Sequence, residues 1–387
     1  MVIKPGVVPE YFKETQIGDP LYQPPHERIM KAAFMANLPK AAGDQKKTLR
    51  LHVDKMPDFS WLLTVVQDGI LKRMAPEALR PILNLPKHWE DSIEWFTKLD
   101  YFKFDSVLGG RLSVPNSWIG TLKATQWDYI NAPAITQHAC TIDWHGMTSI
   151  FDRHMYVAMD TKQARDLGIK PGSIPTAFVH GEDEMFPILT PDRIWHATKN
   201  PDGIWKPLFQ PDWVYDYAKN LVDNNKQPLI LWTIHCQRQT MGACIDPVVM
   251  SMITYHHYAR GLLQTEPILF YKGMAWKWDE YGAFGGEVED PEDANSGLRV
   301  DTLEAFDQYE LIVVDGDAWD KCVLTTVQQA IDIFKKLGIP QMIKKMVVLS
   351  DCCGTIPGFE DFAKKAWQKL VDKEEIRIET TETFSLV

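Results

Sequence analysis

Short apolar runs alternate with longer segments of helical periodicity along most of the chain. Short runs bounded by turn residues favour β-strands, and apolar residues three or four positions apart favour amphipathic helices. Helices are predicted at 212–225 and 247–261, from Cys322 onward, and up to about residue 371. Strands are predicted at 48–53, 134–143, 228–234, 267–272 and 311–314, in "MVVLSDCC" (346–353), and at an edge strand "IRIET" (376–380).

The succession of these elements predicts the fold class. The strands read as apolar runs rather than as alternating apolar and polar positions, which is typical of strands buried on both faces. Strands that alternate with helices form parallel sheets between layers of helices. We therefore expect an α/β fold with a doubly wound, mainly parallel sheet and helices on both faces.

Three segments fall outside this pattern. Residues 1–46 are rich in proline and polar residues and predict an extended N-terminal arm, suited to packing on a partner subunit. Residues 47–387 predict a single domain with insertions at about 60–108 and 160–205. The first insertion is helical in character, and the second is dense in Pro, Gly and Asp, as surface segments are.

Composition narrows the range of partners. The 387 residues carry a net charge of −11 and contain no Lys/Arg-rich run, so no nucleic-acid partner is expected. The apolar runs are far shorter than a membrane span, and the N-terminus has neither a signal-peptide nor a transit-peptide pattern. Six cysteines do not make a disulfide framework, so reduced thiols and a cytoplasmic location are expected.

Reactive side chains recur where the predicted strands end. In a parallel α/β sheet, ligands gather at the carboxyl ends of the strands. A set of this size is hard to reach by chance and predicts an active site there. Its members are Asp54, Asp143, His145, His235, Lys272 and Cys322.

Cys322 begins a segment of helical periodicity six residues after the strand's closing Gly316. Free amides and the helix dipole stabilise a thiolate at a helix N-terminus, so we expect a lowered pKa and a nucleophilic thiol. The alternative is that Cys322 is a small buried apolar residue, as most free cysteines are.

Six motifs together resemble the isochorismatase-like cysteine hydrolases, and among these the nicotinamidases most closely. They occur in the order of that family and span residues 48 to about 370. The motifs are "LHVDKMPDF" (51–59), "GGRLSVP" (109–115), "TIDWH" (141–145), "WTIHCQRQTMGACIDP" (232–247), "YKGMAWKWDEYGAF" (271–284) and "GDAWDKCV" (316–323).

The resemblance implies a Cys-Lys-Asp triad for hydrolysis of a small amide. Cys322 would be the nucleophile, Asp54 the general base, and Lys272 the cation that holds both in register. A thiol beside a lysine and a carboxylate suits covalent acyl transfer. The resemblance also implies a cis peptide between Asp317 and Ala318, with the N–H groups of Ala318 and Cys322 forming the oxyanion hole.

The resemblance further implies a divalent metal, expected to be Zn²⁺, on Asp143, His145 and His235. An Asp-x-His pair with one further histidine and open positions is reasonable zinc chemistry. Alternatively, the Asp-x-His pair arises by chance and His235 is a core histidine. Many relatives carry another histidine soon after the pair. Here the nearest candidates are Asp152 and His154.

Three aromatic residues are expected in the substrate pocket. In nicotinamidases a Phe and a Trp form flat walls, and Phe59 and Trp232 match them here. Trp319 replaces the threonine that the family has near the cysteine, and we expect its indole near the pocket. Alternatively, Phe59 and Trp232 are ordinary aromatic residues of the core.

The resemblance implies a homo-oligomer acting on a small amide, most closely nicotinamide. Two alternatives stay open. One is an amidase of the same family with a ureido or carbamoyl substrate, and the other is a non-catalytic scaffold that uses the insertions as interaction surfaces. Isochorismatases proper cleave a vinyl ether and need no cysteine, so Cys322 favours amide hydrolysis.

Overall fold

The structure is a computed structural model of the whole chain. It describes residues 47–55, 114, 117–175, 178–179, 182–183, 187–232, 235–239, 241–259, 266–356, 358–374 and 376–386. The expected arm (1–46), the expected insertion at 60–108 and Phe59 lie outside the described residues.

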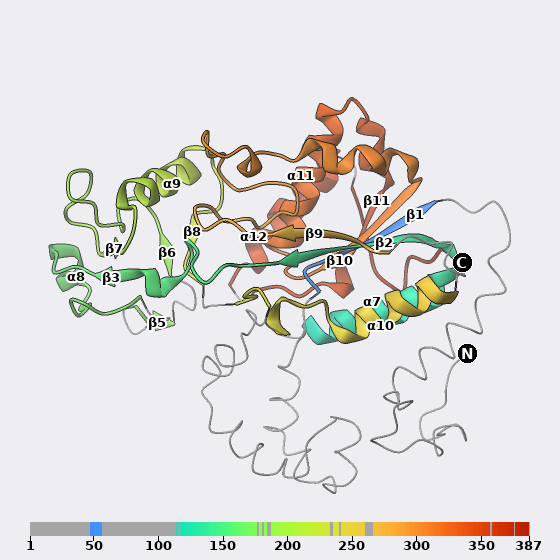
Figure 1. Cartoon of the computed structure of the whole chain (residues 1–387), viewed down its shortest axis with the longest axis horizontal. Coiled ribbons are helices and arrows are strands. Elements are labelled where there is room, and N and C mark those ends of the chain that lie inside the picture. Colours follow the sequence, from blue (N-terminus) through green and yellow to red (C-terminus); the bar gives the residue numbers. More distant parts are fainter. Residues whose placement is uncertain are drawn as a thin grey trace, which may run out of the picture.

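A six-stranded parallel sheet forms the centre of the molecule (Figure 1). Its strand order is β12-β11-β10-β1-β2-β9, and every neighbouring pair runs parallel. The expected parallel sheet is thus confirmed. Its strands are β1 (Thr48–Val53), β2 (Ile135–Asp143), β9 (Ile268–Lys272), β10 (Leu311–Gly316), β11 (Met346–Leu349) and β12 (Arg377–Glu379).

Helices cover both faces of this sheet, as expected. Helices α11 (Cys322–Lys336) and α12 (Glu360–Glu374) pack on one face, where their apolar residues meet Leu51 and Val314 in one core. The other face is covered by α10 (Pro247–Ala259), which matches a predicted helix, and by α7 (Ser117–Asn131), which was not predicted (Figure 1). No helix within the described residues is long and apolar enough to span a bilayer.

Strand β1 departs from the expected apolar pattern, because its polar positions are buried as well. Leu49, Leu51 and Val53 alternate with Arg50 and His52, and all of them are almost inaccessible to solvent. A buried charge is tolerated only when it is paired. Here the Arg50 guanidinium lies 2.6 Å from Asp128 of α7 and 2.8 Å from Asp315 of β10. The face of β1 toward α7 is therefore ionic rather than apolar.

A lobe of short elements extends from one end of the sheet (Figure 1). The described residues of the expected insertion at 160–205 lie in it, and their apolar side chains share a core with α9. The helices are α8 (Lys162–Asp166) and α9 (Pro211–Asp223), and the strands are β3 (Tyr156–Ala158), β4 (Phe178–Val179), β5 (Glu182–Asp183), β6 (Ile188–Leu189), β7 (Trp205–Pro207) and β8 (Leu229–Ile230). Short 3₁₀ helices complete the chain: η3 (Ala132–Ala134), η4 (Arg153–Met155), η5 (Met241–Ala243), η6 (Ala294–Ser296), η7 (Val300–Gln308), η8 (Pro340–Lys345) and η9 (Ser350–Cys352).

The prediction of a central-sheet strand at 228–234 is wrong. Among the described residues of this run only β8 forms, and it pairs antiparallel with β6 in the lobe. The central sheet has no place for it, because β2 pairs directly with β9 from Ala139↔Ile268 to Asp143↔Lys272. The apolar side chains of this run are buried in the core of the lobe instead.

Candidate active site

A cleft opens at the carboxyl ends of the central strands, between the sheet and the lobe. It encloses about 570 Å³ of empty space, including its mouth open to solvent. Seven of its lining residues were predicted site residues, and six of these were expected to act through their side chains: Asp143, His145, Trp232, His235, Lys272 and Cys322. Ala318 also lines the cleft, and Asp54 lies beneath it in contact with Lys272.

Lys272 contacts both of the other residues of the expected triad, Asp54 and Cys322. Its side chain is buried at the end of β9, and its Nζ lies 2.9 Å from Asp54 Oδ2 and 3.8 Å from Cys322 Sγ. The same ammonium also donates to Asp143, the paired residue at the end of β2. One cation therefore joins side chains that follow three different strands.

Asp54 is held as a potential proton acceptor directly after β1. Its Oδ1 accepts a hydrogen bond from the Thr141 hydroxyl at 2.6 Å, and its own N–H donates to that hydroxyl at 3.0 Å. Burial raises the pKa of Asp54 to about 6, and the attraction of Lys272 opposes this rise. A carboxyl group with this pKa accepts a proton at neutral pH and readily returns it.

The expectation of a lowered pKa for Cys322 is wrong when no substrate is bound. Cys322 does begin α11, but burial raises its pKa well above the ordinary value, and the Asp54 charge adds to this rise. Lys272 acts in the opposite direction without reversing the balance. The group at the helix N-terminus is thus a thiol, and it needs a base to become a nucleophile.

Two backbone amides beside the thiol donate to no acceptor among the described residues. The Asp317–Ala318 peptide is cis, as the resemblance implied. Within the part of the chain that the structure describes, neither Ala318 N–H nor Cys322 N–H donates to a protein acceptor. The neighbouring N–H of Trp319 is taken by the Gly354 carbonyl at 2.7 Å. The two free donors are therefore available to an oxygen bound next to Sγ.

The three expected metal ligands lie together on the other side of Lys272. One ligand atom each from Asp143, His145 and His235 falls within 4.8 Å of the others. His145 Nδ1 lies 3.0 Å from the Gly273 carbonyl, so Nδ1–H donates and Nε2 keeps its lone pair. Gly273 permits this approach, because a Cβ there would lie 2.3 Å from Nδ1.

This donor set fits a divalent cation. His145 Nε2 is buried and has no hydrogen-bond partner among the described residues. Although burial acts against the charge of Asp143, Lys272 and His145 hold its pKa well below the ordinary value. A carboxylate, a correctly oriented imidazole and a second histidine are typical zinc ligands. Asp152 and His154, which we considered as a fourth ligand, do not belong to this group.

The aromatic residues are distributed differently from the expectation. Trp232 lines the cleft, and its Nε1 donates to the Tyr281 hydroxyl at 3.2 Å. Trp319 does not line the cleft; its indole stacks on Trp367 of α12 at 4.2 Å between ring centroids. The expectation that the Trp319 indole lies near the pocket is wrong, because the ring packs against α12 and the apolar core shared with it.

Sequence reasoning missed four polar residues of the cleft wall: Asp279, Glu280, Tyr281 and Lys321. Burial raises the pKa of Asp279 to about 6 and lowers the pKa of Lys321 to about 8. A signal was present in the sequence, since Asp279, Glu280 and Tyr281 lie in "WDEYGAF" (278–284) and Lys321 directly precedes Cys322.

Neither family models nor curated proteins match this chain. Among solved structures it is similar to a nicotinamidase/pyrazinamidase of Acinetobacter baumanii, with 15% identity, a TM-score of 0.42, and coverage of 88% of this chain and 99% of that one. It is also similar to the yeast nicotinamidase Pnc1p bound to the inhibitor nicotinaldehyde, with 16% identity, a TM-score of 0.42, and coverage of 86% of this chain and 99% of that one. A third similar structure is an N-carbamoylsarcosine amidase of Thermoplasma acidophilum, with 9% identity, a TM-score of 0.35, and coverage of 87% of this chain and 98% of that one. These three solved structures are two nicotinamidases and an N-carbamoylsarcosine amidase.

Proposed function

We propose that this protein is a cysteine-dependent amidohydrolase that hydrolyses nicotinamide or a related small aromatic amide to the acid and ammonia. The observation that carries the proposal is the position of Lys272, whose ammonium contacts both Asp54 and the Cys322 thiol. A buried cation between a thiol and a carboxylate has a clear use in covalent acyl transfer.

The first step is attack on the substrate carbonyl. Asp54 takes the proton of the Cys322 thiol, and Sγ forms a bond to the carbonyl carbon. Because the thiol has a raised pKa and Asp54 a pKa of about 6, proton transfer accompanies the attack rather than preceding it. The N–H groups of Ala318 and Cys322 stabilise the oxyanion, at about 3 kcal/mol each in acyl transfer.

The second half of the reaction releases ammonia. The C–N bond breaks as Asp54 returns its proton to the leaving nitrogen, which leaves a thioester on Cys322. Water then attacks the thioester with Asp54 again as base, and the acid leaves as Sγ regains its proton. Lys272 keeps the carboxylate and the sulfur in register through both halves.

Asp143, His145 and His235 would hold the divalent metal. When bound, this cation would offer an open position to a ring nitrogen or to water. The protein's own part is to present the ligands: the Gly273 carbonyl fixes the His145 tautomer, and Lys272 stabilises the charged form of Asp143.

The proposed substrate is a flat ring because one flat wall lines the cleft. Trp232 provides that wall and is fixed by its hydrogen bond to Tyr281. Stacking on an aromatic ring contributes roughly 0.5–1.5 kcal/mol beyond the burial of apolar area. Phe59 remains the expected opposite wall.

The test is ammonia release from nicotinamide, pyrazinamide, benzamide and acetamide, with Cys322→Ala as the control. Nicotinamide and pyrazinamide should be hydrolysed faster than benzamide, which lacks a ring nitrogen, and acetamide should be poorest. Equal rates for benzamide and nicotinamide would contradict ring-nitrogen recognition. Hydrolysis of an N-carbamoyl compound alone would contradict the aromatic substrate and favour a carbamoyl amidase.

A further inference from the structure

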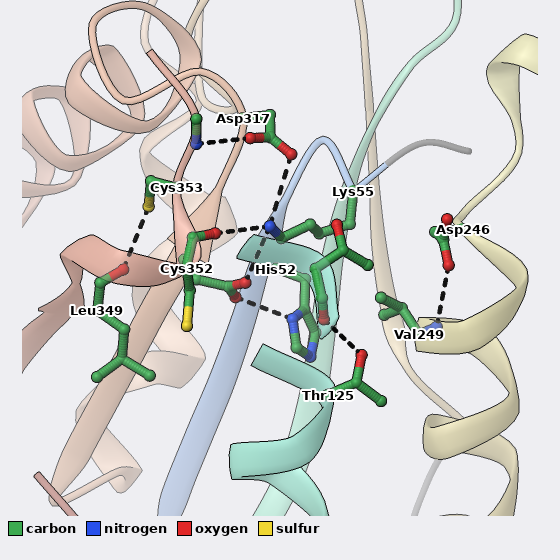
Figure 2. A network of polar contacts seen from close by, with 12 residues as sticks. His52, Lys55, Thr125, Asp246, Val249, Asp317, Leu349, Cys352 and Cys353 are labelled. Atoms are coloured by element: carbon green, nitrogen blue, oxygen red, sulfur yellow. Dashed lines mark hydrogen bonds and ion pairs between the residues drawn. The ribbon is translucent and has the colours of Figure 1, made fainter. Parts of the chain in front are cut away.

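Lys55 directly follows Asp54 in the chain, yet its side chain takes no part in the cleft. It is 99% buried and lies in an ionic cluster at the α7 face of the sheet (Figure 2). Burying a lysine ammonium is costly unless its charge is compensated. Its partners therefore show which part of the structure it stabilises.

The Lys55 ammonium has three partners. It donates to the Cys352 carbonyl at 2.7 Å and lies 3.5 Å from both Asp315 Oδ2 and Asp317 Oδ2. Figure 2 shows its contacts with Cys352 and Asp317. Asp315 is already paired with Arg50 at 2.8 Å. The contact with Asp317 makes Lys55 a counter-ion of this carboxylate as well.

Asp317 is held on all sides by this arrangement. Its Oδ1 accepts from Gly354 N–H at 2.9 Å, and its own N–H donates to the Val53 carbonyl at 3.0 Å. Its carbonyl carbon belongs to the cis peptide whose nitrogen is that of Ala318. Whatever fixes Asp317 therefore also fixes the direction of the Ala318 N–H.

We propose that Lys55 is a positioning residue that aims the Ala318 N–H at the oxyanion formed on Cys322. This inference rests on the proposed function. Lys55 connects the end of β1, which carries the base Asp54, to the turn that carries the oxyanion donor. Its charge is secure: burial disfavours the ammonium, but Asp317 and Asp315 hold its pKa above the ordinary value.

The test compares two reactions of the same thiol. In acylation by p-nitrophenyl acetate, the S–C bond forms, Asp54 takes the thiol proton, the ester C–O bond breaks and p-nitrophenolate leaves. This reaction passes through an oxyanion, whereas alkylation by iodoacetamide displaces iodide and forms none. Both require Asp54, so the ratio of their rates at Cys322 isolates the oxyanion donors. Each rate is followed on the Cys322 peptide by mass spectrometry.

Lys55→Met should slow acylation about 10- to 100-fold, since a donor is misdirected rather than removed. It should change alkylation by less than about threefold, because alkylation develops no charge on oxygen. Lys345→Met is the matched control, because Lys345 donates to the Tyr309 carbonyl on another part of the fold. It should leave both rates unchanged.

Two further variants cover the case in which Lys55→Met does not fold. Lys55→Arg should retain most of the acylation rate. Asp317→Asn should lower acylation selectively, and the double variant should be no slower than the slower single variant, because partners in one contact are not additive. Equal losses in both reactions, or no loss of acylation, would overturn the role of Lys55. A wild-type protein in which Cys322 is not acylated at all would instead contradict the proposed function.

Discussion

Lys272 donates a hydrogen bond to Asp143, and through this contact the triad and the metal-ligand group share one buried cation. Asp143 is thus a ligand candidate whose charge is stabilised from the catalytic side. Lys272 is at the same time the partner of Asp54. The two groups are therefore coupled, and a change in one should be felt in the other.

We expect about one divalent ion per chain when the protein is purified without chelator, measured by elemental analysis. His235→Ala should lose that ion, because two ligands remain where three are needed, and should raise the KM for nicotinamide. His196→Ala is the control, since His196 pairs with Asp212 in the lobe. A metal-free protein with full amidase activity would rule out this assignment.

Cys322→Ala should reduce ammonia release to background while the unfolding midpoint stays close to that of the wild type. The raised pKa changes the labelling experiment, because Cys244 is exposed and competes for iodoacetamide. Labelling should therefore be done in a Cys244→Ala background. Among the remaining thiols Cys322 should react first, because it lines the cleft beside Lys272 and the base Asp54, whereas Cys140 and Cys352 are buried. Earlier labelling of Cys352, with an active Cys322→Ala variant, would remove the triad.

The activity should fall as the pH decreases through about 6, because protonated Asp54 cannot take the proton of Cys322. The Thr141 hydroxyl lowers the pKa of Asp54, so Thr141→Val should move this acidic limb to higher pH. The measurement is kcat/KM against pH, within the range where circular dichroism shows the fold to be intact. A flat profile down to pH 5 would mean that Asp54 is not the base.

Trp319→Ala should affect stability rather than substrate choice, because its ring packs on Trp367 outside the cleft. Truncation of a partly buried tryptophan should cost about 2–3 kcal/mol in urea unfolding, below the range for a fully buried one. The KM for nicotinamide should stay within about twofold of wild type, since no stacking on the substrate is lost. Trp232→Ala, by contrast, should raise it about tenfold through lost stacking and burial. A selective change of KM in Trp319→Ala would restore its place in the pocket.

The inner strands of the central sheet were predictable, because their side chains are buried on both faces, whereas β9 at one edge exposes Leu269 and Tyr271. Six of the seven predicted strands match β1, β2, β9, β10, β11 and β12 to within a few residues. The exception shows the limit of the pattern. An apolar run indicates burial but not the partner, so residues 228–234 look like a sheet strand although β8 belongs to the lobe.

The candidate site was predictable where chemistry follows strand ends, and unpredictable where it depends on packing. Asp54, Lys272 and Cys322 meet because their strands run parallel. The pKa of Cys322 depends on burial and on Asp54, neither of which is visible in a helix start. Lys55 was overlooked for the same reason, since its partners Asp315 and Asp317 are more than 250 positions away in the chain.

Strand β1 lies in the middle of the sheet between β10 and β2, and this placement has a consequence for biosynthesis. Its contacts with β10 join residues 263 positions apart, as between Arg50 and Val313. Such non-local pairing forms slowly. While the ribosome is still translating the region before Leu311, the edge of β1 that pairs with β10 has no hydrogen-bond partners. Arg50, which is buried in the folded protein, then lacks its partner Asp315. A nascent chain of this length should depend on chaperones, and the active cysteine should become functional only after nearly the whole domain has been made.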